Sequence, residues 1–300
     1  MLLRRYDKAA NQAARQVIST YSTSFSLATR LLRGRVRTDI RNLYAMVRIA
    51  DEIVDGTASA AGLDSAAVRD ELDRYEDQVL RAPHVRFHTD PVLHAYAITA
   101  RRCEFSDDYV RAFFRSMRWD TAENACSTRE FHDYVYGSAE VIGLLCLQVF
   151  LAGHHVYSAE RERMTASARR LGAAFQKVNF LRDLGEDSLE LGRTYFPELA
   201  AKKLDWETKN ALVEDIRADL AAAQRAIPLL PVDARIGVQA ATDLFTALTD
   251  RIDRLSPAEV ADPHSRVRVP GYEKSLITAR AVRKAMVRQD GLEPEGPEET

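Results

Sequence analysis

Two aspartates stand one helical turn apart in the segment VRIADEIVDG, residues 47–56. On a helix, side chains three or four residues apart share a face, so Tyr44, Arg48, Asp51 and Asp55 form one polar stripe. The apolar residues between them lie on a different side, which suits packing against a core. A single aspartate pair beside an arginine is most often a solvated ion-pair arrangement worth at most about 1 kcal/mol. This stripe alone leaves open whether it is an exposed surface or a cation site.

Another segment, residues 174–197, repeats the design with the sequence AFQKVNFLRDLGEDSLELGRTYFP. Gln176, Asn179, Asp183 and Asp187 follow one another at steps of three, four and four, so they form another polar stripe on an expected helix. Buried amides and carboxylates cost free energy unless they are paired. Two polar stripes set among large apolar residues therefore favour a binding site over two solvated surfaces.

The residue types in the two stripes indicate what such a site would bind. Oxygen ligands without histidine or thiolate partners suit a hard cation, above all Mg²⁺. Mg²⁺ keeps several waters and usually bridges one or two carboxylates to the phosphate oxygens of a substrate. Arg48 and Arg182, close to the same faces, could bind the remaining phosphate charge. A helical bundle with two such faces across an apolar cavity would suit a lipid that carries a diphosphate.

Helical periodicity dominates the chain, in which glycine (13) and proline (10) are scarce and alternating apolar runs are few. No glycine-rich phosphate loop and no internal repeat of fixed period occurs in the sequence. Asp39, Asp64 and Ser106 are expected to cap helix N-termini. We expect helices near residues 7–20, 38–55, 64–80, 90–103, 106–120, 128–135, 137–153, 158–187, 206–227, 233–254 and 271–288.

The pattern favours one all-α domain over residues 1–288, followed by an acidic tail, residues 289–300, that is expected to be disordered because it lacks apolar anchors. A content of 46% hydrophobic and 29% charged residues is typical of a soluble protein. The net charge of −2 gives no reason to expect a nucleic-acid partner. Three cysteines without metal-ligand spacing favour a reducing, cytoplasmic location.

Membrane contact is expected, if at all, at the surface. The N-terminus lacks the apolar core of a secretion signal, and the most lipophilic stretch, residues 141–153, is shorter than the ~20 residues that a membrane-spanning helix needs. We therefore predict no transmembrane segment and interpret this stretch as a buried core helix. A late basic group is either a solvated helix face or a surface that contacts an anionic membrane. Its members are Arg266, Arg268, Lys274, Arg280, Arg283, Lys284 and Arg288.

These motifs resemble those of a known family, the head-to-head isoprenyl synthases, which comprises phytoene, squalene and dehydrosqualene synthases. That family has two aspartate-rich motifs. YAMVRIADEIVD resembles one of them, and NFLRDLGED with its continuation GRTYFP resembles the other. The likeness extends to YSTSFSLA, YVYGSAEVIG and RVRVP, and so spans nearly all of residues 20–280. The forms DEIVDG and SAEVIG are most similar to bacterial phytoene synthases.

The resemblance implies a single-domain, isoprenoid-synthase-type helical bundle with a central apolar cavity. The implied reaction joins two molecules of geranylgeranyl diphosphate through a cyclopropyl diphosphate to phytoene, releasing diphosphate, in carotenoid biosynthesis. It depends on Mg²⁺, for which Mn²⁺ could substitute. NADPH is not expected, because it serves the squalene synthases as the hydride donor of the last step. Downstream carotenoid enzymes are conceivable partners.

The resemblance also carries roles onto matching positions, with four aspartates and a tyrosine acting in catalysis. The Mg²⁺–diphosphate group would be held by Asp51, Asp55, Asn179, Asp183 and Asp187. Diphosphate oxygens would be contacted by Tyr44, Arg48, Arg182 and Arg266. The reaction centre would be lined by Gln176 and Tyr134, and the entrance of the donor site closed by Ser22, Ser24 and Phe25. Two positions depart from the family pattern, because Phe245 stands where some members have a tyrosine and Thr23 where some have a basic residue.

Two alternatives stay open. One is a synthase that joins two farnesyl diphosphates to squalene or dehydrosqualene, and the depth of the cavity would decide between the substrates. The other belongs to a different class, a non-catalytic subunit that binds a lipid diphosphate. Its mark would be the loss of an aspartate from either stripe, whereas all four are present.

Overall fold

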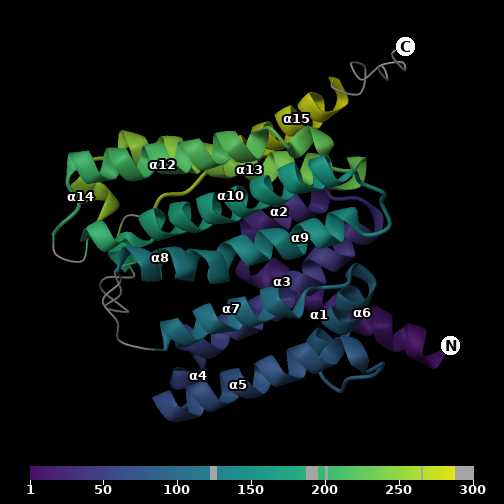
Figure 1. Cartoon of the computed structure of the whole chain (residues 1–300). Helices are drawn as coiled ribbons and strands as arrows, with labels where there is room; N and C mark the ends of the chain where they lie inside the picture. The colour runs from purple at the N-terminus through teal and green to yellow at the C-terminus, as the bar shows by residue number, and fades with distance from the viewer. Residues whose placement is uncertain (122–126, 187–194, 200–201, 265, 288–300) are drawn as a thin grey trace.

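The computed structural model describes residues 1–121, 127–186, 195–199, 202–264 and 266–287, and within them every regular element is a helix. The long helices run roughly along one direction and stack in layers, with α9 and α10 in the middle (Figure 1). The predicted all-α, single-domain bundle is confirmed.

The longer helices are α1 (Leu2–Tyr21), α2 (Thr23–Leu31), α3 (Gly34–Val54), α5 (Ser65–Arg81), α6 (Pro91–Cys103), α7 (Asp107–Asp120), α8 (Thr128–Val135), α9 (Val141–Leu151), α10 (Ser158–Arg182), α12 (Trp206–Gln224), α13 (Val232–Arg254) and α15 (Gly271–Val287). Shorter turns are α4 (Thr57–Ala60), η1 (Ala82–His84), η2 (Tyr136–Glu140), η3 (Pro197–Leu199), η4 (Ile227–Leu229) and α14 (Pro257–Val260).

Helix starts follow from local capping chemistry in some places and not in others. The Asp64 side chain accepts a hydrogen bond from the backbone N–H of Ala67 at 2.8 Å, so this predicted N-cap of α5 is confirmed. Ser106 is the N-cap residue of α7, but its side chain makes no capping bond. The expected cap at Asp39 is wrong. α3 begins five residues earlier, at Gly34, and Asp39 lies in its interior with 3% of its surface exposed.

Larger departures from the predicted helices occur at α2, at α8 with α9, and at α10. The whole of α2 was not predicted, because its nine residues are too few to show a clear 3.6-residue period. The expected helices 128–135 and 137–153 form one continuous run through the π-helical turn η2. The expected helix 158–187 is interrupted, since α10 ends at Arg182 and Asp183 is its C-cap residue. Asp187 and the tail 289–300 lie outside the described residues.

The middle of the bundle is held by helices that approach very closely. A Cβ atom added to Gly172 of α10 would overlap the carbonyl oxygen of Ala139 in η2, and one added to Gly143 of α9 would overlap that of Ala168 in α10. By length and composition one described helix, the run Thr128–Leu151, could cross a membrane, yet 61% of its most apolar window is buried inside the protein. This is the burial of a core helix.

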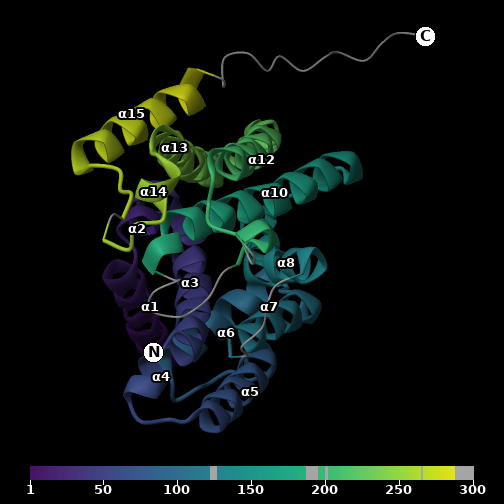
Figure 2. The same ribbon diagram turned by 90° about the vertical axis from the view of Figure 1, so that its left-hand side faces the viewer.

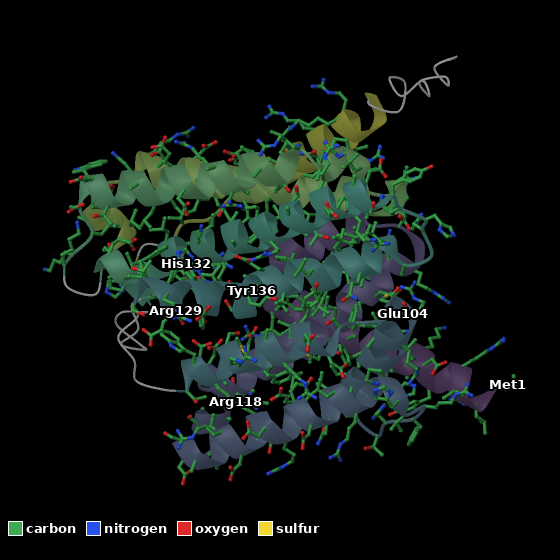
Figure 3. All side chains as sticks on the ribbon, in the orientation of Figure 1. Met1, Glu104, Arg118, Arg129, His132 and Tyr136 are labelled. Atoms are coloured by element: carbon green, nitrogen blue, oxygen red, sulfur yellow. The ribbon has the colours of Figure 1, made fainter. Side chains whose placement is uncertain are left out.

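Several helices that carry polar residues end on the same side of the bundle. α3 ends at Val54, α7 at Asp120 and α10 at Arg182, all toward the left of Figure 1, which faces the viewer in Figure 2. Arg118, near the end of α7, donates to Asp73 of α5 at 2.8 Å and also binds Glu76 there (Figure 3). The carboxyl end of a helix carries the negative pole of the helix dipole, which favours a cation close to each of these three termini.

Candidate active site

An apolar cavity of about 230 Å³ lies inside the bundle between α2, α9, α10, α12 and α13. α10 lines it from Met164 to Asn179, which is a helical rise of about 22 Å. Gln176 and Asn179 supply amide groups to the lining near the C-terminal end of α10, while Met164 lies near its other end. The predicted central apolar cavity is thereby confirmed, and one of its ends is polar.

Aromatic rings form the wall of this cavity next to its polar end. The Phe25 ring lies 6.1 Å from the Tyr44 ring of α3 and 6.1 Å from the Phe175 ring of α10, measured between centroids. Phe175 in turn stacks on Phe245 of α13 at 3.8 Å. Phe25 therefore joins the two helices that carry the polar stripes. Ser22 holds Phe25 in place, because it caps α2 by accepting the Phe25 backbone N–H at 3.1 Å.

The polar stripe of α3 occupies the last turns of that helix. Arg48 Nη1 lies 3.8 Å from Asp51 Oδ2, and the same guanidinium binds Glu52. The guanidinium also stacks over the Tyr21 ring, with 4.5 Å between Cζ and the ring centroid. Glu52, which is not part of the polar stripe, thus neutralises the charge of Arg48. About a quarter of the Arg48 and Asp51 side chains is exposed (26% and 28%), so both can be reached by a ligand.

Other carboxylates lie close enough to Asp51 to affect its pKa. Burial raises the pKa of Asp51 well above its usual range, and the charges of Asp55 and Asp120 raise it further. Asp55 is the C-cap residue of α3, where its backbone N–H donates to the Asp51 carbonyl at 2.8 Å. Each of these carboxylates stands at or near a helix C-terminus, where the helix dipole adds to the unfavourable charge.

Asp120 was not singled out in the sequence, yet it is a buried partner of a predicted catalytic residue. Tyr134 Oη donates to both carboxylate oxygens of Asp120 at 3.0 Å, and 5% and 6% of the two residues' surfaces are exposed. Burial raises the pKa of Tyr134 well above its usual range, with the Asp120 charge as the next cause. No spacing rule links the two, because they belong to different helices, α7 and α8. The sequence therefore held no signal for this pair.

The polar stripe of α10 ends in an ion-pair group at the end of that helix. Arg182 Nε donates to Asp183 Oδ1 at 2.8 Å, and Arg266 Nε reaches the same oxygen at 3.0 Å. Arg266 Nη1 also lies 3.7 Å from Glu186 Oε2. Asp183 thus forms ion pairs with two arginines that are far apart in the sequence. The same two arginines are those predicted to contact diphosphate oxygens.

Most of the predicted site residues lie within the described part of the chain. Tyr134 lies near both helices that carry the polar stripes. Its ring centroid is 5.9 Å from that of Phe180 on α10, and the charge of Asp55, at the end of α3, is among the causes that raise its pKa. A direct approach of Asp51 to Asp183 across the cavity stays a prediction. Asp187 and the side chains of Thr23 and Ser24 lie outside the described residues. The described members are Ser22 and Phe25 on α2, Tyr44, Arg48, Asp51 and Asp55 on α3, Tyr134 on α8, Gln176, Asn179 and Arg182 on α10, and Asp183 and Arg266 beyond it.

The residue types at this end suit a divalent cation that is shared with a ligand. Within the described residues, no group of three or more histidine, cysteine, aspartate or glutamate side chains is arranged to hold a metal alone. Mg²⁺ needs fewer, since it commonly binds one or two carboxylates and takes its other ligands from water and substrate phosphates. The carboxylates of Asp55 and Asp120 lie close enough to raise the pKa of Asp51, and such neighbouring carboxylates attract a cation. The donors therefore fit Mg²⁺ bound together with a diphosphate.

A comparison with known protein families matches residues 18–273 to the family described as squalene/phytoene synthase. This match takes in both polar stripes and most of the chain. The chain belongs to the squalene/phytoene synthase family. Members of this family are prenyl transferases of isoprenoid and carotenoid biosynthesis, and they use a divalent metal with diphosphate substrates.

Proteins named phytoene synthase are similar to this chain over most of its length. The phytoene synthase of Arthrospira platensis is 28% identical over 298 residues, covering 92% of this chain and 93% of that protein. The phytoene synthase of Mycobacterium tuberculosis is 27% identical over 296 residues, covering 91% and 90%. The bifunctional lycopene cyclase/phytoene synthase of Leptosphaeria maculans is 27% identical over 313 residues. That match covers 93% of this chain, which spans only 52% of the fungal protein's length.

Solved structures share the fold. A crystal structure of a dehydrosqualene synthase matches with a TM-score of 0.74 at 19% identity, covering 95% of this chain and 99% of that one. A squalene synthase from Alicyclobacillus acidocaldarius matches with a TM-score of 0.69 at 20% identity, covering 86% and 96%. At these identities the likeness establishes the isoprenoid-synthase type of bundle, in agreement with the sequence-based expectation.

Proposed function

We propose that the protein joins two molecules of geranylgeranyl diphosphate head to head to form phytoene and releases diphosphate. The observation that carries this proposal is the form of the cavity, which is apolar along α10 and ends at the amides of Gln176 and Asn179, about one helical turn before Arg182 and Asp183. An extended chain of four isoprene units is roughly 20 Å long at ordinary carbon–carbon bond lengths. The lining of α10 extends for about 22 Å. The similarity to proteins named phytoene synthase supports the same substrate.

The polar end would bind the diphosphate. Asp51, Asp55, Asn179, Asp183 and Asp187 would hold Mg²⁺, which when bound neutralises the charge that develops on the departing diphosphate. The guanidinium groups of Arg48, Arg182 and Arg266 would take the remaining oxygens, because planar guanidinium pairs well with phosphate. In the ligand-free protein these arginines are neutralised by acidic neighbours, so a diphosphate would replace carboxylate partners that are already close.

The aromatic side chains beside the polar end of the cavity would protect the allylic cation. Water would quench this cation to an alcohol, and the rings of Phe25, Phe175 and Phe245 exclude water next to the polar end. Their faces also carry negative partial charge that attracts a cation. Phe245, which replaces a tyrosine found in some relatives, would act only as part of this wall, because 5% of its surface is exposed and its ring stacks on Phe175.

Tyr134 would stabilise positive charge as a protonated phenol. Its raised pKa keeps the hydroxyl protonated at neutral pH, and the proton is held between its oxygen and the Asp120 carboxylate. A hydroxyl that donates to a buried carboxylate has increased electron density on its oxygen. The oxygen would therefore favour a cation nearby without taking up a proton itself.

Release of diphosphate tests this assignment directly. Replacing Asp51 or Asp183 by alanine (Asp51→Ala, Asp183→Ala) is expected to lower the rate of diphosphate release from geranylgeranyl diphosphate by at least about a hundredfold. Asp51→Ala should not lower the melting temperature, because burial and like charges already disfavour this carboxylate in the folded state. The matched control is Asp77→Ala, an exposed aspartate on α5. Wild-type rates in either site variant would exclude the proposed role of that residue.

A further inference from the structure

A separate basic region lies outside the candidate active site, on the surface formed by α1, α2 and α3. Residues 30–41 contain five arginines and a single acidic residue, Asp39. Asp39 makes its ion pair with Arg102 and not with any of them, because it points into the core, where it also accepts a hydrogen bond from Thr99 Oγ1 at 2.7 Å. The segment is therefore strongly positive in a chain whose net charge is −2.

Four arginines lie on three helices that contact one another, and we call them the arginine cluster: Arg15 of α1, Arg30 of α2, and Arg37 and Arg41 of α3. Arg37 and Arg41 stand one turn apart on α3, and both α1 and α2 contact that helix. Burial lowers the pKa of Arg41, and the charges of Arg15, Arg37 and Arg30 lower it further. Arg41 is thus half-buried among like charges.

Local bonds fix the frame of the cluster on both sides of Arg41. Asn42 Nδ2 donates to Asn11 Oδ1 of α1 at 2.9 Å, which ties α1 to α3 beside Arg41. Arg37 Nε donates to the Leu32 carbonyl at 2.7 Å, which ties α3 to the end of α2. The cluster is therefore built on rigid helices and not on a loop.

Within the described part of the chain, none of the four arginines lies within 4 Å of a carboxylate oxygen in an ion pair. Arg37 and Arg41, the two that are half-buried, differ in this from other half-buried cations. Arg48, Arg102, Arg118 and Lys177 each bind at least one acidic side chain. Partly buried positive charges without a partner repel one another and destabilise the fold. An anion from outside the chain would remove this repulsion.

We propose that the arginine cluster is an additional anion site, which binds a phosphate group. A planar guanidinium group can donate two parallel hydrogen bonds to two phosphate oxygens. The positive charge of four arginines is greater than a monovalent anion would neutralise. The cluster is separate from the candidate active site, because none of its members lines the apolar cavity and Arg41 lies about 10 Å along α3 from Arg48. The proposal does not depend on the reaction that the protein catalyses.

The phosphate could belong to the headgroup of an anionic membrane lipid or to a free diphosphate. Arg15 of α1 and Arg30 of α2 are both exposed. The helices α1, α2 and α15 lie along one side of the molecule (Figure 2). A flat membrane surface could reach both. A free diphosphate would instead be held by the half-buried Arg41 and its neighbours. Both sources share the same chemistry, so an experiment has to separate them.

The test measures two kinds of binding with the full-length protein and without metal. Calorimetric titration with inorganic diphosphate in EDTA at low salt measures the binding of free diphosphate. Sedimentation with phosphatidylcholine vesicles, with or without phosphatidylglycerol, measures the binding of the protein to lipid. Arg30→Gln and Arg41→Gln are each expected to weaken whichever binding the wild type shows by about fivefold. The matched control, Arg69→Gln on α5, removes an exposed arginine elsewhere and should change neither.

The outcomes decide both the site and its source. A loss confined to vesicles with phosphatidylglycerol assigns the site to a lipid headgroup, and a loss in the calorimetric titration assigns it to a free diphosphate. Arg30→Gln alters an exposed side chain, so it keeps the test valid if Arg41→Gln fails to fold. Binding that is absent from the wild type in both experiments, or that both variants retain at the level of Arg69→Gln, would overturn the proposal.

Discussion

At the scale of the residue, burial and like charge act together on the carboxyl group of Asp51. Its nearest positive charge, Arg48, is shared with Glu52, while Asp55 and Asp120 add negative charge. Such a group is unfavourable for folding, and a bound cation would make it favourable. This is the physical reason to regard the end of α3 as a binding site and not as a solvated surface.

The pair of Tyr134 and Asp120 gives a prediction at the same scale. Tyr134→Phe removes the hydroxyl and leaves the Asp120 carboxylate buried without this donor. We expect the free energy of unfolding to fall by about 1.5–3 kcal/mol, the usual value for a hydrogen bond to a charged group. We also expect kcat to fall by about tenfold or more, since the oriented hydroxyl would stabilise the cation.

Tyr75→Phe is the matched control for this variant. The Tyr75 hydroxyl is also buried, and it donates to the Met46 carbonyl at 3.3 Å, away from the polar end. Its loss should cost about 1 kcal/mol of stability, measured by urea unfolding, and leave kcat unchanged. Equal kcat values for the two variants would show that Tyr134 has only a structural role.

Sequence reasoning at this scale succeeded where spacing along one helix carries the information. Arg48, Asp51 and Asp55 share a face because a helix repeats every 3.6 residues, and that repeat is visible in the sequence. Asp120 was missed because its partner, Tyr134, stands on another helix and is brought near by packing alone. Asp39 was misread as a cap because its real partners, Thr99 and Arg102, lie some sixty residues away.

At the scale of the element, the geometry of the site depends on how closely α10 packs against its neighbours. Gly172 and Gly143 lie where backbone meets backbone, and both positions line the cavity. α10 therefore lies close to η2 and α9, which sets the width of the cavity. Its polar end is fixed in turn by the break at Asp183, which lets that side chain meet Arg266.

Gly172→Ala tests this close packing. The added methyl group would overlap the Ala139 carbonyl, which is backbone and cannot rotate away, so α10 and η2 must separate. We expect a loss of about 1–3 kcal/mol in the free energy of unfolding, as for other overpacked cores. The control is Gly271→Ala at the start of α15, where nothing lies within 4 Å of the added atom. Equal stability of both variants in thermal unfolding would contradict the close approach.

The elements also show the limit of sequence-based prediction. Most helices with a long apolar period were found within a few residues of their observed bounds, as with α5 and α13. α2 was missed although it carries Phe25 at the cavity and follows its cap Ser22, since nine residues show too little periodicity. The π-helical turn at η2 was interpreted as a break between helices, because the sequence does not reveal a change of hydrogen-bond register.

At the scale of the whole molecule, charged side chains lie in three main regions. Carboxylates at the ends of α3, α7 and α10 make one end of the bundle negative, whereas the arginine cluster makes the surface of α1 and α2 positive. The late basic group predicted to contact a membrane is a third region. On α15 it accompanies two exposed apolar side chains, Tyr272 (72% exposed) and Leu276 (53%). Contact of this group with a membrane stays a prediction.

The central claim is that this cavity joins two twenty-carbon chains in a reaction that depends on a metal at its polar end. The most direct measurement incubates the purified protein with geranylgeranyl or farnesyl diphosphate, with Mg²⁺ or EDTA, and with or without NADPH, and identifies the extracted hydrocarbon by mass spectrometry. We expect a forty-carbon hydrocarbon from geranylgeranyl diphosphate that requires Mg²⁺ and is unchanged by NADPH. A thirty-carbon product from farnesyl diphosphate alone would contradict the proposed substrate, and no hydrocarbon from either would contradict the proposed reaction.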